Sequence, residues 1–177
     1  CGVAVFIEDH APFVFRLHVA PVRGGAAPEQ AVVRCEAFRV EEVDGAQEAF
    51  MNRGGIRTDL VFATSGAEGD GNVTYEEAFT VQPFGNSLVT MTLTGAQLEL
   101  MLEQQFCGIN AVAPRVLQPS AGFAYTWNAA AIGSADCATA NAIDPATTIP
   151  NGAPVTAAGT YRVTVNSFLA DGGDGFS

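Results

Sequence analysis

Short runs in which apolar and polar residues alternate divide this chain into predicted strands. Residues 87–93 alternate and are rich in β-branched side chains, as expected for a half-buried strand. Residues 123–127 alternate again, and a last run at residues 161–165 follows a Pro-Asn-Gly turn signal. Residues 44–51 combine a turn with a short apolar segment that leads to Asn52.

Two capping boxes predict where helices begin, because a Thr and a Glu or Gln three residues later can bond each other's backbone N–H groups. Thr74 with Glu77 opens a short helix that runs through Phe79. Thr94 with Gln97 opens a second helix, expected to end near Phe106. One face of this second helix carries Leu98, Met101, Leu102 and Gln105.

The order of these elements predicts the fold class. Residues 108–119 show neither the periodicity of a helix nor that of a strand and are predicted to form an irregular loop. The chain contains no internal repeat, and its strands and helices do not alternate regularly as in a βαβ protein. Mixed strands and helices of this kind are typical of an α+β domain.

Composition and charge limit the partners. The 177 residues are nearly half apolar, enough for one ordinary domain with a core. A net charge of −11 argues against nucleic acid or an anionic membrane as the main partner, so a nucleotide phosphate would need local arginines. No run is long and apolar enough to span a bilayer. The first residue is not Met and no secretory signal is recognisable, which indicates a processed product or a piece of a longer chain.

Three glycine turns carry side chains that together suit a nucleotide. Residues 52–57 read N-R-G-G-I-R, residues 82–86 read Q-P-F-G-N, and residues 166–176 read N-S-F-L-A-D-G-G-D-G-F. Glycines allow positive φ or a close approach of backbone to a ligand. Arginine can bind an anion through two hydrogen bonds, and aspartate accepts hydrogen bonds from hydroxyls.

These motifs, in this order, resemble the C-terminal domain of the 5′-nucleotidase family, which includes UDP-sugar hydrolases and 2′,3′-cyclic phosphodiesterases. The resemblance assigns residues 44–177 to a substrate-binding domain and implies a layered α/β/β/α-type fold with mixed sheets. Residues 1–43 stay unassigned, because the family's helix with a leucine-glycine-asparagine core is not found around residues 22–29, and Arg23, Arg34 and Arg39 stand in a different setting. Divergence and a reading-frame or boundary error both explain this. The family continues beyond Ser177, so the domain is expected to be incomplete at both ends.

The resemblance also implies roles for single residues. Phe84 and Phe168 would stack on the two faces of a base, an interaction worth about 1–3 kcal/mol per base. Asn86 would bond the edge of the base, Asp174 would accept hydrogen bonds from the ribose hydroxyls, and Gly122 would give the ligand access to the backbone. The alternatives are core positions for the two rings and turn-forming roles for the amide and the carboxylate.

The same resemblance makes Arg57 the residue that grips the phosphate and Asn52 one that orients the nucleoside. The alternatives are a structural Arg57 paired with Asp59 and an Asn52 that only forms a turn.

Hydrolysis in this family takes place on two divalent metal ions in an N-terminal metallophosphatase domain. This chain contains no D-x-H, G-N-H-D or G-N-H-E motif, and its only histidines are His10 and His18. No serine or cysteine nucleophile stands beside a base. We therefore expect no catalytic residue, no metal site and no hydrolysis by this chain alone.

The chain has four cysteines and no C-x-x-C pair, so a structural zinc site is not expected. Cys107 and Cys137 bracket a loop-rich segment and are either joined or two buried free thiols. The disulfide is favoured, because the family is largely exported and the chain is poor in lysine. It would contribute about 3–4 kcal/mol in the chain-entropy model. Cys1 is either a lipid-bearing residue or the start of a shortened sequence.

The sequence thus predicts the nucleotide-binding, substrate-specificity domain of an exported 5′-nucleotidase-like phosphoesterase, located in the periplasm, at the cell surface or outside the cell. One alternative is a stand-alone nucleoside- or nucleotide-binding module without a hydrolytic partner. Another is an incomplete fragment that binds nothing stably.

Overall fold

The structure is a computed structural model that describes residues 45–120, 122–148, 150 and 152–177, together with the backbone of three earlier strands. It divides into two units, one of residues 1–38 and 54–85 and one of residues 39–53 and 86–177. The expectations about Cys1, Arg23 and Arg39 lie outside the described residues. The chain passes from one unit to the other between Arg53 and Gly54 in the first motif and between Gly85 and Asn86 in the second.

The first unit contains a three-stranded antiparallel sheet built from the earliest part of the chain. Its strands are β1 (Val3–Phe6), β2 (Val14–Ala20) and β3 (Val32–Cys35), in that spatial order. The pairing aligns Val3 with Leu17, and Leu17 in turn with Cys35. The 3₁₀ turn η1 (Arg53–Gly55) and the helix α1 (Tyr75–Val81) follow later in the chain.

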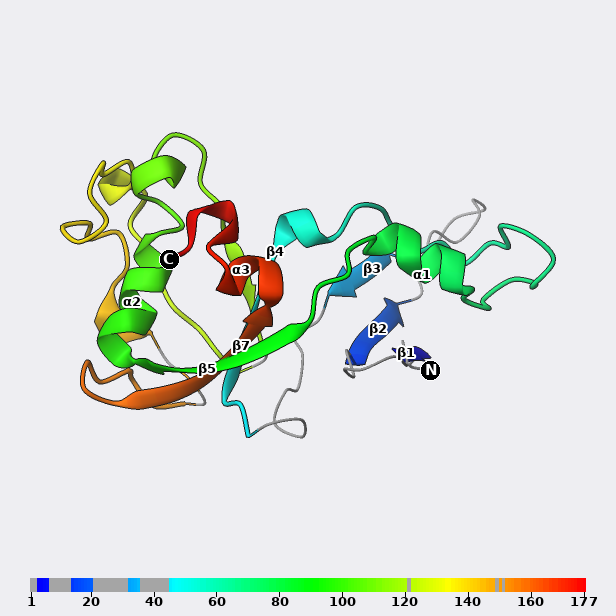
Figure 1. Ribbon diagram of the computed structural model, residues 1–177, viewed down its shortest axis with the longest axis horizontal. Helices are drawn as coiled ribbons and strands as arrows, with labels where there is room; N and C mark the ends of the chain where they lie inside the picture. Colours follow the sequence, from blue (N-terminus) through cyan, green and yellow to red (C-terminus); the bar gives the residue numbers. More distant parts are fainter. Residues whose placement is uncertain are drawn as a thin grey trace. The chain divides into compact units, whose positions relative to one another are not determined.

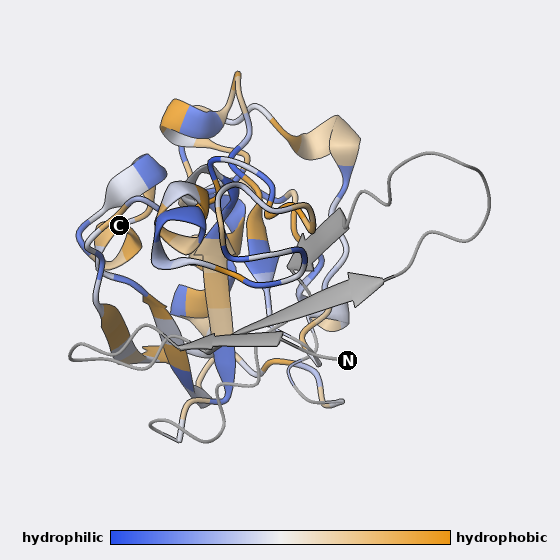
Figure 2. Cartoon of the chain, turned by 90° about the vertical axis from the view of Figure 1, so that its right-hand side faces the viewer, coloured by the Kyte–Doolittle hydropathy of each residue, from blue (hydrophilic) through white to orange (hydrophobic). Residues whose placement is uncertain are grey.

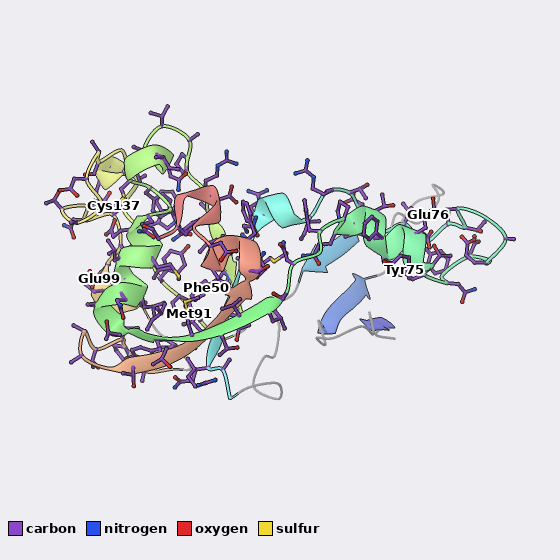
Figure 3. The ribbon with its side chains drawn as sticks, viewed as in Figure 1. Phe50, Tyr75, Glu76, Met91, Glu99 and Cys137 are labelled. Carbon is purple, nitrogen blue, oxygen red and sulfur yellow. A yellow bond between two sulfur atoms is a disulfide. The ribbon has the colours of Figure 1, made fainter. Side chains whose placement is uncertain are left out.

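Helix α1 begins as the capping box predicts. The Thr74 Oγ1 atom accepts a hydrogen bond from the Glu77 amide at 3.2 Å, and the Glu77 carboxylate accepts one from the Thr74 amide at 2.8 Å. The helix continues to Val81, slightly beyond the predicted end at Phe79. None of its residues is buried, and the rings of Tyr75 and Phe79 stack on its surface with centroids 5.9 Å apart. Figure 3 shows Tyr75 and Glu76 on this helix.

The second unit is built on a mixed four-stranded sheet with a few short helices, which makes it an α+β domain as predicted (Figure 1). The strands lie in the order β5 (Leu88–Thr94), β7 (Thr160–Asn166), β4 (Glu48–Asn52) and β6 (Leu117–Pro119). The helices are α2 (Gly95–Glu103), α3 (Ser167–Ala170) and the 3₁₀ turns η2 (Gly108–Asn110), η3 (Ala129–Ala131), η4 (Pro145–Thr147) and η5 (Gly173–Gly175). The finer layered arrangement stays a prediction.

Strand direction determines which side chains meet at one end of this sheet. Strand β7 runs parallel to β4, with Ala49 beside Thr164, and antiparallel to β5, with Leu88 beside Asn166. The carboxyl ends of β4 and β7 and the amino end of β5 therefore lie at the same edge. Figure 1 shows β7 passing directly into α3 at this edge. Parts of all three sequence motifs converge there as a result.

Helix α2 also begins at its predicted capping box, with Thr94 and Gln97 bonded to each other at 2.8 and 3.2 Å. It ends at Glu103, before the predicted end at Phe106. The backbone tightens after Glu103, because the Phe106 amide bonds the Glu103 carbonyl at 2.9 Å and the Gln105 carbonyl accepts from Arg115. The helix therefore stops where its next carbonyls are taken by another segment.

Two sequence predictions in the loops were wrong. Residues 117–119 form β6 instead of continuing a loop, with Met51 of β4 beside Gln118. Such a short strand that ends in proline gives no alternating pattern to detect. Residues 123–127 form no regular strand; the Thr126 amide bonds the hydroxyl of Thr147 at 2.9 Å, and Trp127 forms an isolated bridge to Ile143. The expected turn at residues 150–153 is closed by a 3.2 Å bond from Ala153 N to Pro150 O.

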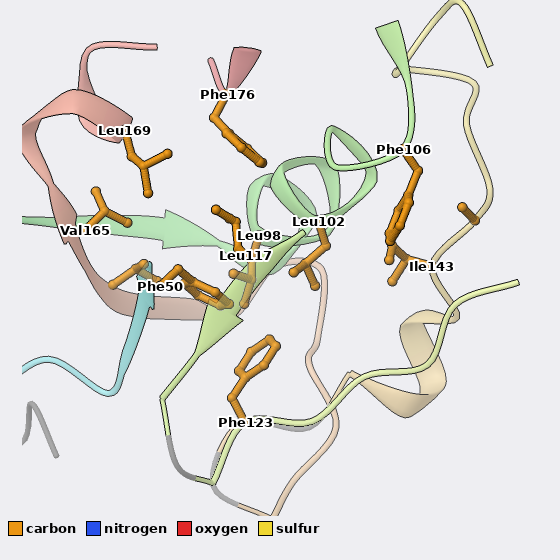
Figure 4. Close-up of a cluster of buried hydrophobic side chains, with 12 residues drawn as sticks. Phe50, Leu98, Leu102, Phe106, Leu117, Phe123, Ile143, Val165, Leu169 and Phe176 are labelled. Atoms are coloured by element: carbon orange, nitrogen blue, oxygen red, sulfur yellow. The ribbon is translucent and has the colours of Figure 1, made fainter. Parts of the chain in front are cut away.

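The core of the second unit joins α2 to the sheet (Figure 4). Leu98 and Leu102 of α2 are completely buried, and Phe50 of β4 meets Phe123 edge to face with ring centroids 5.0 Å apart. Figure 2 shows hydrophobic and hydrophilic positions along the strands, as expected where side chains point to both faces of a sheet. Burial of the apolar set stabilises this unit at about 25 cal/mol per Å². Its members are Phe50, Leu98, Leu102, Phe106, Leu117, Phe123, Ala142, Ile143, Val163, Val165, Leu169 and Phe176.

Candidate functional site

The site in the second unit begins with two asparagines at the ends of neighbouring parallel strands. Asn52 ends β4 and Asn166 ends β7, and both are buried, with exposed fractions of 7% and 2%. The Asn166 Nδ2 atom donates to Asn52 Oδ1 at 2.9 Å. The Asn166 Oδ1 atom accepts from the Leu169 amide at 2.9 Å and so caps α3. Asn166 therefore joins the first motif to the helix within the third.

The next link in this network is the carboxylate of Asp174. The Asn52 Nδ2 atom donates to Asp174 Oδ2 at 3.1 Å, which joins residues 122 positions apart. Asp174 lies in η5 with φ 56° and ψ 16°, a left-handed conformation that few residues with a side chain adopt. Its second carboxylate oxygen has no hydrogen-bond partner within the described part of the chain. The network therefore holds a carboxylate in place with one oxygen still able to accept from a ligand.

The ring of Phe168 stands beside this network and is 44% exposed. Phe168 is in the first turn of α3, two residues after the Asn166 cap. A Cβ atom at Gly173 would overlap the Phe168 ring, so only glycine lets this ring lie against the turn. An exposed ring supported on one side by backbone is suited to stacking on a planar group.

Asn86 and Ser167 meet at the same edge of the sheet. The Ser167 hydroxyl donates to Asn86 Oδ1 at 3.4 Å and accepts from the Ser87 amide at 3.2 Å. The backbone amide of Ser167 also bonds the Ser87 carbonyl at 2.8 Å. The amide of the second motif is thus bonded to the residue that directly precedes Phe168.

The first unit contains the other two predicted contacts, Arg57 and Phe84. The Arg57 guanidinium lies 5.9 Å from the centre of the Phe84 ring and donates to the Gly54 carbonyl at 3.3 Å. Its backbone amide bonds the carbonyl of Val81, which ends α1, at 2.8 Å. Within the described residues, Arg57 forms no ion pair with Asp59, the structural alternative considered for it. Phe84 is 43% exposed.

The structure therefore groups the predicted residues into two sets. Asn52, Asn86, Phe168 and Asp174 belong to the second unit, and Arg57 and Phe84 belong to the first. Gly122 has φ 95° in an exposed turn after β6, and no described contact joins it to either set.

Two contributors to the site have no role among the sequence predictions. Asn166 is the first residue of the third motif, but the sequence assigned it no role. Its hydrogen bonds, which join β4, β7 and α3, become apparent only when the strands are paired. Asn110 donates through Nδ2 to the Asp174 carbonyl at 2.8 Å and lies in a segment predicted to be irregular. No local pattern in the sequence signals it.

A disulfide and three buried polar residues fix the loops behind this site. Cys107 and Cys137 are joined with Cα atoms 5.2 Å apart, the pairing favoured over two free thiols; Figure 3 shows Cys137 in the loops near the C-terminal end of α2. Glu103 accepts from the amides at 142 and 143 at 3.0 and 2.8 Å, and Gln104 donates to Ser177 O at 2.9 Å.

Gln105 completes this set, since its Oε1 accepts from the Leu117 amide at 2.8 Å and from the Tyr125 hydroxyl at 3.0 Å. Burial raises the pKa of Tyr125, so the shift further favours the protonated phenol that donates here. The end of α2 therefore anchors several loops by hydrogen bonds instead of apolar contacts.

The described residues do not form a metal site. Among them, no group of three or more His, Cys, Asp or Glu side chains is arranged to hold an ion. No helix in the described part of the chain is long and apolar enough to cross a membrane.

Comparison with protein families gives the chain its classification. Residues 30–177 match the model of the 5′-nucleotidase C-terminal domain. The chain belongs to this family. The match includes part of the segment before residue 44 that the sequence left unassigned.

Relatives of this 5′-nucleotidase C-terminal domain are long proteins of which it matches a small part. It is 36% identical over 129 residues to the cell wall protein Lmo0130 of Listeria monocytogenes, a match that covers 73% of this chain and 15% of the relative. It is 31% identical over 150 residues to the trifunctional nucleotide phosphoesterase protein YfkN of Bacillus subtilis, with 78% and 9% covered.

Solved structures lead to the same family. A 5′-nucleotidase precursor from Thermus thermophilus is 33% identical with a TM-score of 0.53, covering 75% of this chain and 24% of that one. The NAD nucleotidase NadN of Haemophilus influenzae is 25% identical with a TM-score of 0.53, covering 76% and 22%. The chain thus corresponds to about a quarter of the length of these solved relatives.

Proposed function

We propose that this chain is the nucleotide-binding, substrate-specificity domain of a 5′-nucleotidase-like phosphoesterase. The observation that carries the proposal is the chain of hydrogen bonds from Asn166 through Asn52 to Asp174, beside the supported ring of Phe168. It presents a carboxylate oxygen for hydroxyl donors and a flat apolar surface for a base, a combination that suits a nucleoside because a simple sugar has hydroxyls but no planar base and phosphate has neither.

Each part of the nucleotide has a proposed contact. In the second unit the base stacks on Phe168, and its edge bonds Asn86. Stacking by Phe84, which belongs to the first unit, stays a prediction from the sequence. The ribose hydroxyls donate to Asp174, Asn52 orients the nucleoside, and Gly122 leaves backbone accessible. The phosphate needs a local cation because the chain carries a net charge of −11, and Arg57 in the first unit stays the predicted contact.

Catalysis belongs to the remainder of the full enzyme in this proposal. An N-terminal metallophosphatase domain with two divalent ions would convert nucleotide and water to nucleoside and phosphate. Among the described residues no group of three or more His, Cys, Asp or Glu side chains could hold a metal ion, and in this proposal the chain contributes binding and orientation. A relative named as a cell wall protein and the disulfide support a site of action in the periplasm, at the cell surface or outside the cell.

Calorimetric titration of the chain with adenosine and AMP tests this proposal. We expect saturable binding of both, and Phe168→Ala should weaken it by about 1–3 kcal/mol through loss of one stacking face. Tyr75→Ala, which removes an exposed ring on α1, is the matched control and should leave binding unchanged. A cooperatively folded chain that binds neither ligand would refute the proposal.

A second experiment distinguishes a nucleotidase domain from the stand-alone binding module. Addition of a metallophosphatase domain from a relative, with divalent ions, should produce AMP hydrolysis that Phe168→Ala weakens. Binding of AMP without any hydrolysis in the combined protein would favour the module.

A further inference from the structure

Asp174 has an unusual backbone conformation that needs a cause. Among the described residues it is the one side-chain-bearing residue with positive φ, at 56°. Aspartate tolerates this region better than most residues but does not prefer it. Two nearby glycines, Gly172 at φ 90° and Gly175 at φ 81°, permit the turn without selecting one conformation for Asp174. Something outside the turn must hold it.

The contact that does so comes from the end of η2. Asn110 is 3% exposed, and its Nδ2 atom donates to the Asp174 carbonyl at 2.8 Å and to the Gln104 carbonyl at 2.9 Å. Both N–H groups of one amide are therefore engaged, one on a fixed residue after α2 and one on Asp174. The amide ties the conformation of Asp174 to the end of α2.

Neighbouring contacts make Asn110 itself rigid. A Cβ atom at Gly175 would overlap the side chain of Ile109, so η2 and η5 touch closely. The Gly108 amide bonds the Ser134 carbonyl at 2.9 Å, and the Cys107–Cys137 disulfide closes the same loop. Asn110 thus acts from a fixed position on a turn that is otherwise rich in glycine.

From this geometry we infer that Asn110 is a positioning residue that orients the Asp174 carboxylate and thereby sets recognition of the ribose hydroxyls. The inference rests on the proposed function and adds to it a residue that does not touch the ligand. Asn110 holds the carbonyl of Asp174, and Asn52 holds one of its carboxylate oxygens. With backbone and side chain both fixed, the other oxygen has one direction in which to accept from a hydroxyl.

The test compares two substitutions of the same kind in nearby buried amides. Asn110→Asp removes both donors with little change of shape, and Gln104→Glu does the same to a side chain that bonds Ser177 instead of Asp174. Both add one negative charge, so the probes are the neutral nucleosides adenosine and 2′- and 3′-deoxyadenosine, with the uridine series in parallel.

We expect Asn110→Asp to reduce the preference for adenosine over its deoxy forms about tenfold or more, because a hydrogen bond to a charged group is lost only with the ribonucleoside. Gln104→Glu should leave that ratio unchanged. Equal weakening of all nucleosides by Asn110→Asp, or an unchanged ratio in a folded variant, would overturn the inference and assign Asn110 a purely structural role.

A ligand-free measurement separates this inference from the proposed function. Backbone coupling constants and nuclear Overhauser effects report the sign of φ at Asp174, which should be positive in the unmodified chain and in Gln104→Glu. In Asn110→Asp it should shift to negative values or become averaged. A positive φ that persists in Asn110→Asp overturns the positioning role whether or not nucleosides bind. Failure of the unmodified chain to bind any nucleoside overturns the proposed function, and with it the role in ribose recognition.

Discussion

Asn52 and Arg57 lie five positions apart in one motif, but their surroundings differ sharply. Asn52 is buried and bonded on both sides, to Asn166 and to Asp174. Arg57 is exposed, and its side chain has one hydrogen bond to a nearby carbonyl and one ring contact. The amide end of the motif is therefore held in place without a ligand, and under the proposed function the cationic end would gain most of its order from the anion. Preorganisation of the first kind lowers the entropy cost of binding, and an exposed cation mainly attracts and orients charge.

The largest expected effect comes from removal of the disulfide that holds the loops of the second unit. Replacement of both Cys107 and Cys137 by serine removes a cross-link between residues 30 positions apart. We expect the free energy of unfolding of the second unit to fall by about 3–4 kcal/mol, because the unfolded chain regains loop entropy. Urea unfolding of the oxidised chain and of the variant measures this. A loss below about 1 kcal/mol would show that the hydrogen bonds that Glu103, Gln104 and Gln105 form with other segments suffice to hold these loops.

Asn166→Ala tests the amide network directly. It removes the partner of the buried Asn52 and the cap of α3, so stability should fall by about 2–3 kcal/mol and nucleoside binding should be lost. Asn86→Ala is the control, since it removes a partly buried amide with one 3.4 Å bond and should cost about 0.5 kcal/mol. Equal losses of stability in the two variants would show that the buried amide network is no more important to the fold than the partly buried amide of Asn86.

Arg57→Ala should separate charge recognition from stability. We expect AMP affinity to fall about tenfold, as for loss of one charge-assisted contact, with adenosine affinity unchanged and unfolding altered by less than about 0.5 kcal/mol. Titrations at two salt concentrations should show a weaker salt dependence for the variant. Parallel losses for adenosine and AMP would mean that Arg57 supports the fold of the turn and not the phosphate.

The smallest effect concerns pH in the first unit. The carboxylate of Glu68 accepts from the amides of Ser65 and Gly66 at 2.6 and 3.1 Å, and backbone hydrogen bonds lower its pKa to about 2. A lowered pKa means that the folded loop favours the charged form. Its contribution is therefore present above the ordinary value of 4.5 and is lost as the pH falls toward 2. Amide signals of Ser65 and Gly66 should report this transition, and Glu68→Gln should abolish it. Signals that stay constant from about pH 5 to about pH 2 would contradict it.

The two capping boxes show how far local sequence can be trusted. Thr74 and Thr94 each begin a helix at the predicted residue with the same pair of bonds. Capping depends on residues within one turn, so it can be predicted from sequence alone. Burial cannot: α1 buries none of its residues, but α2 places Leu98 and Leu102 in the core.

The errors have a similar origin. Strand β6 exists because β4 offers it hydrogen bonds, and residues 123–127 lose their predicted strand because the backbone of Thr126 bonds residues 144 and 147. Asn110 carries no pattern because its importance depends on a contact with Asp174, 64 positions away. Residues of this kind are found only after the chain is folded.

The sequence by itself determined the family, the α+β class, both helix starts, the strands β5 and β7 and the motifs that carry the candidate site. These features depend on short-range periodicity, capping and motif order, which the amino acids encode directly. The tertiary structure decided which motif residues meet, since parallel pairing of β4 with β7 brings Asn52 to Asn166 and the turn at η5 returns Asp174 to them. Contacts between distant residues form through strand pairing and burial, so no local pattern in the sequence reveals them.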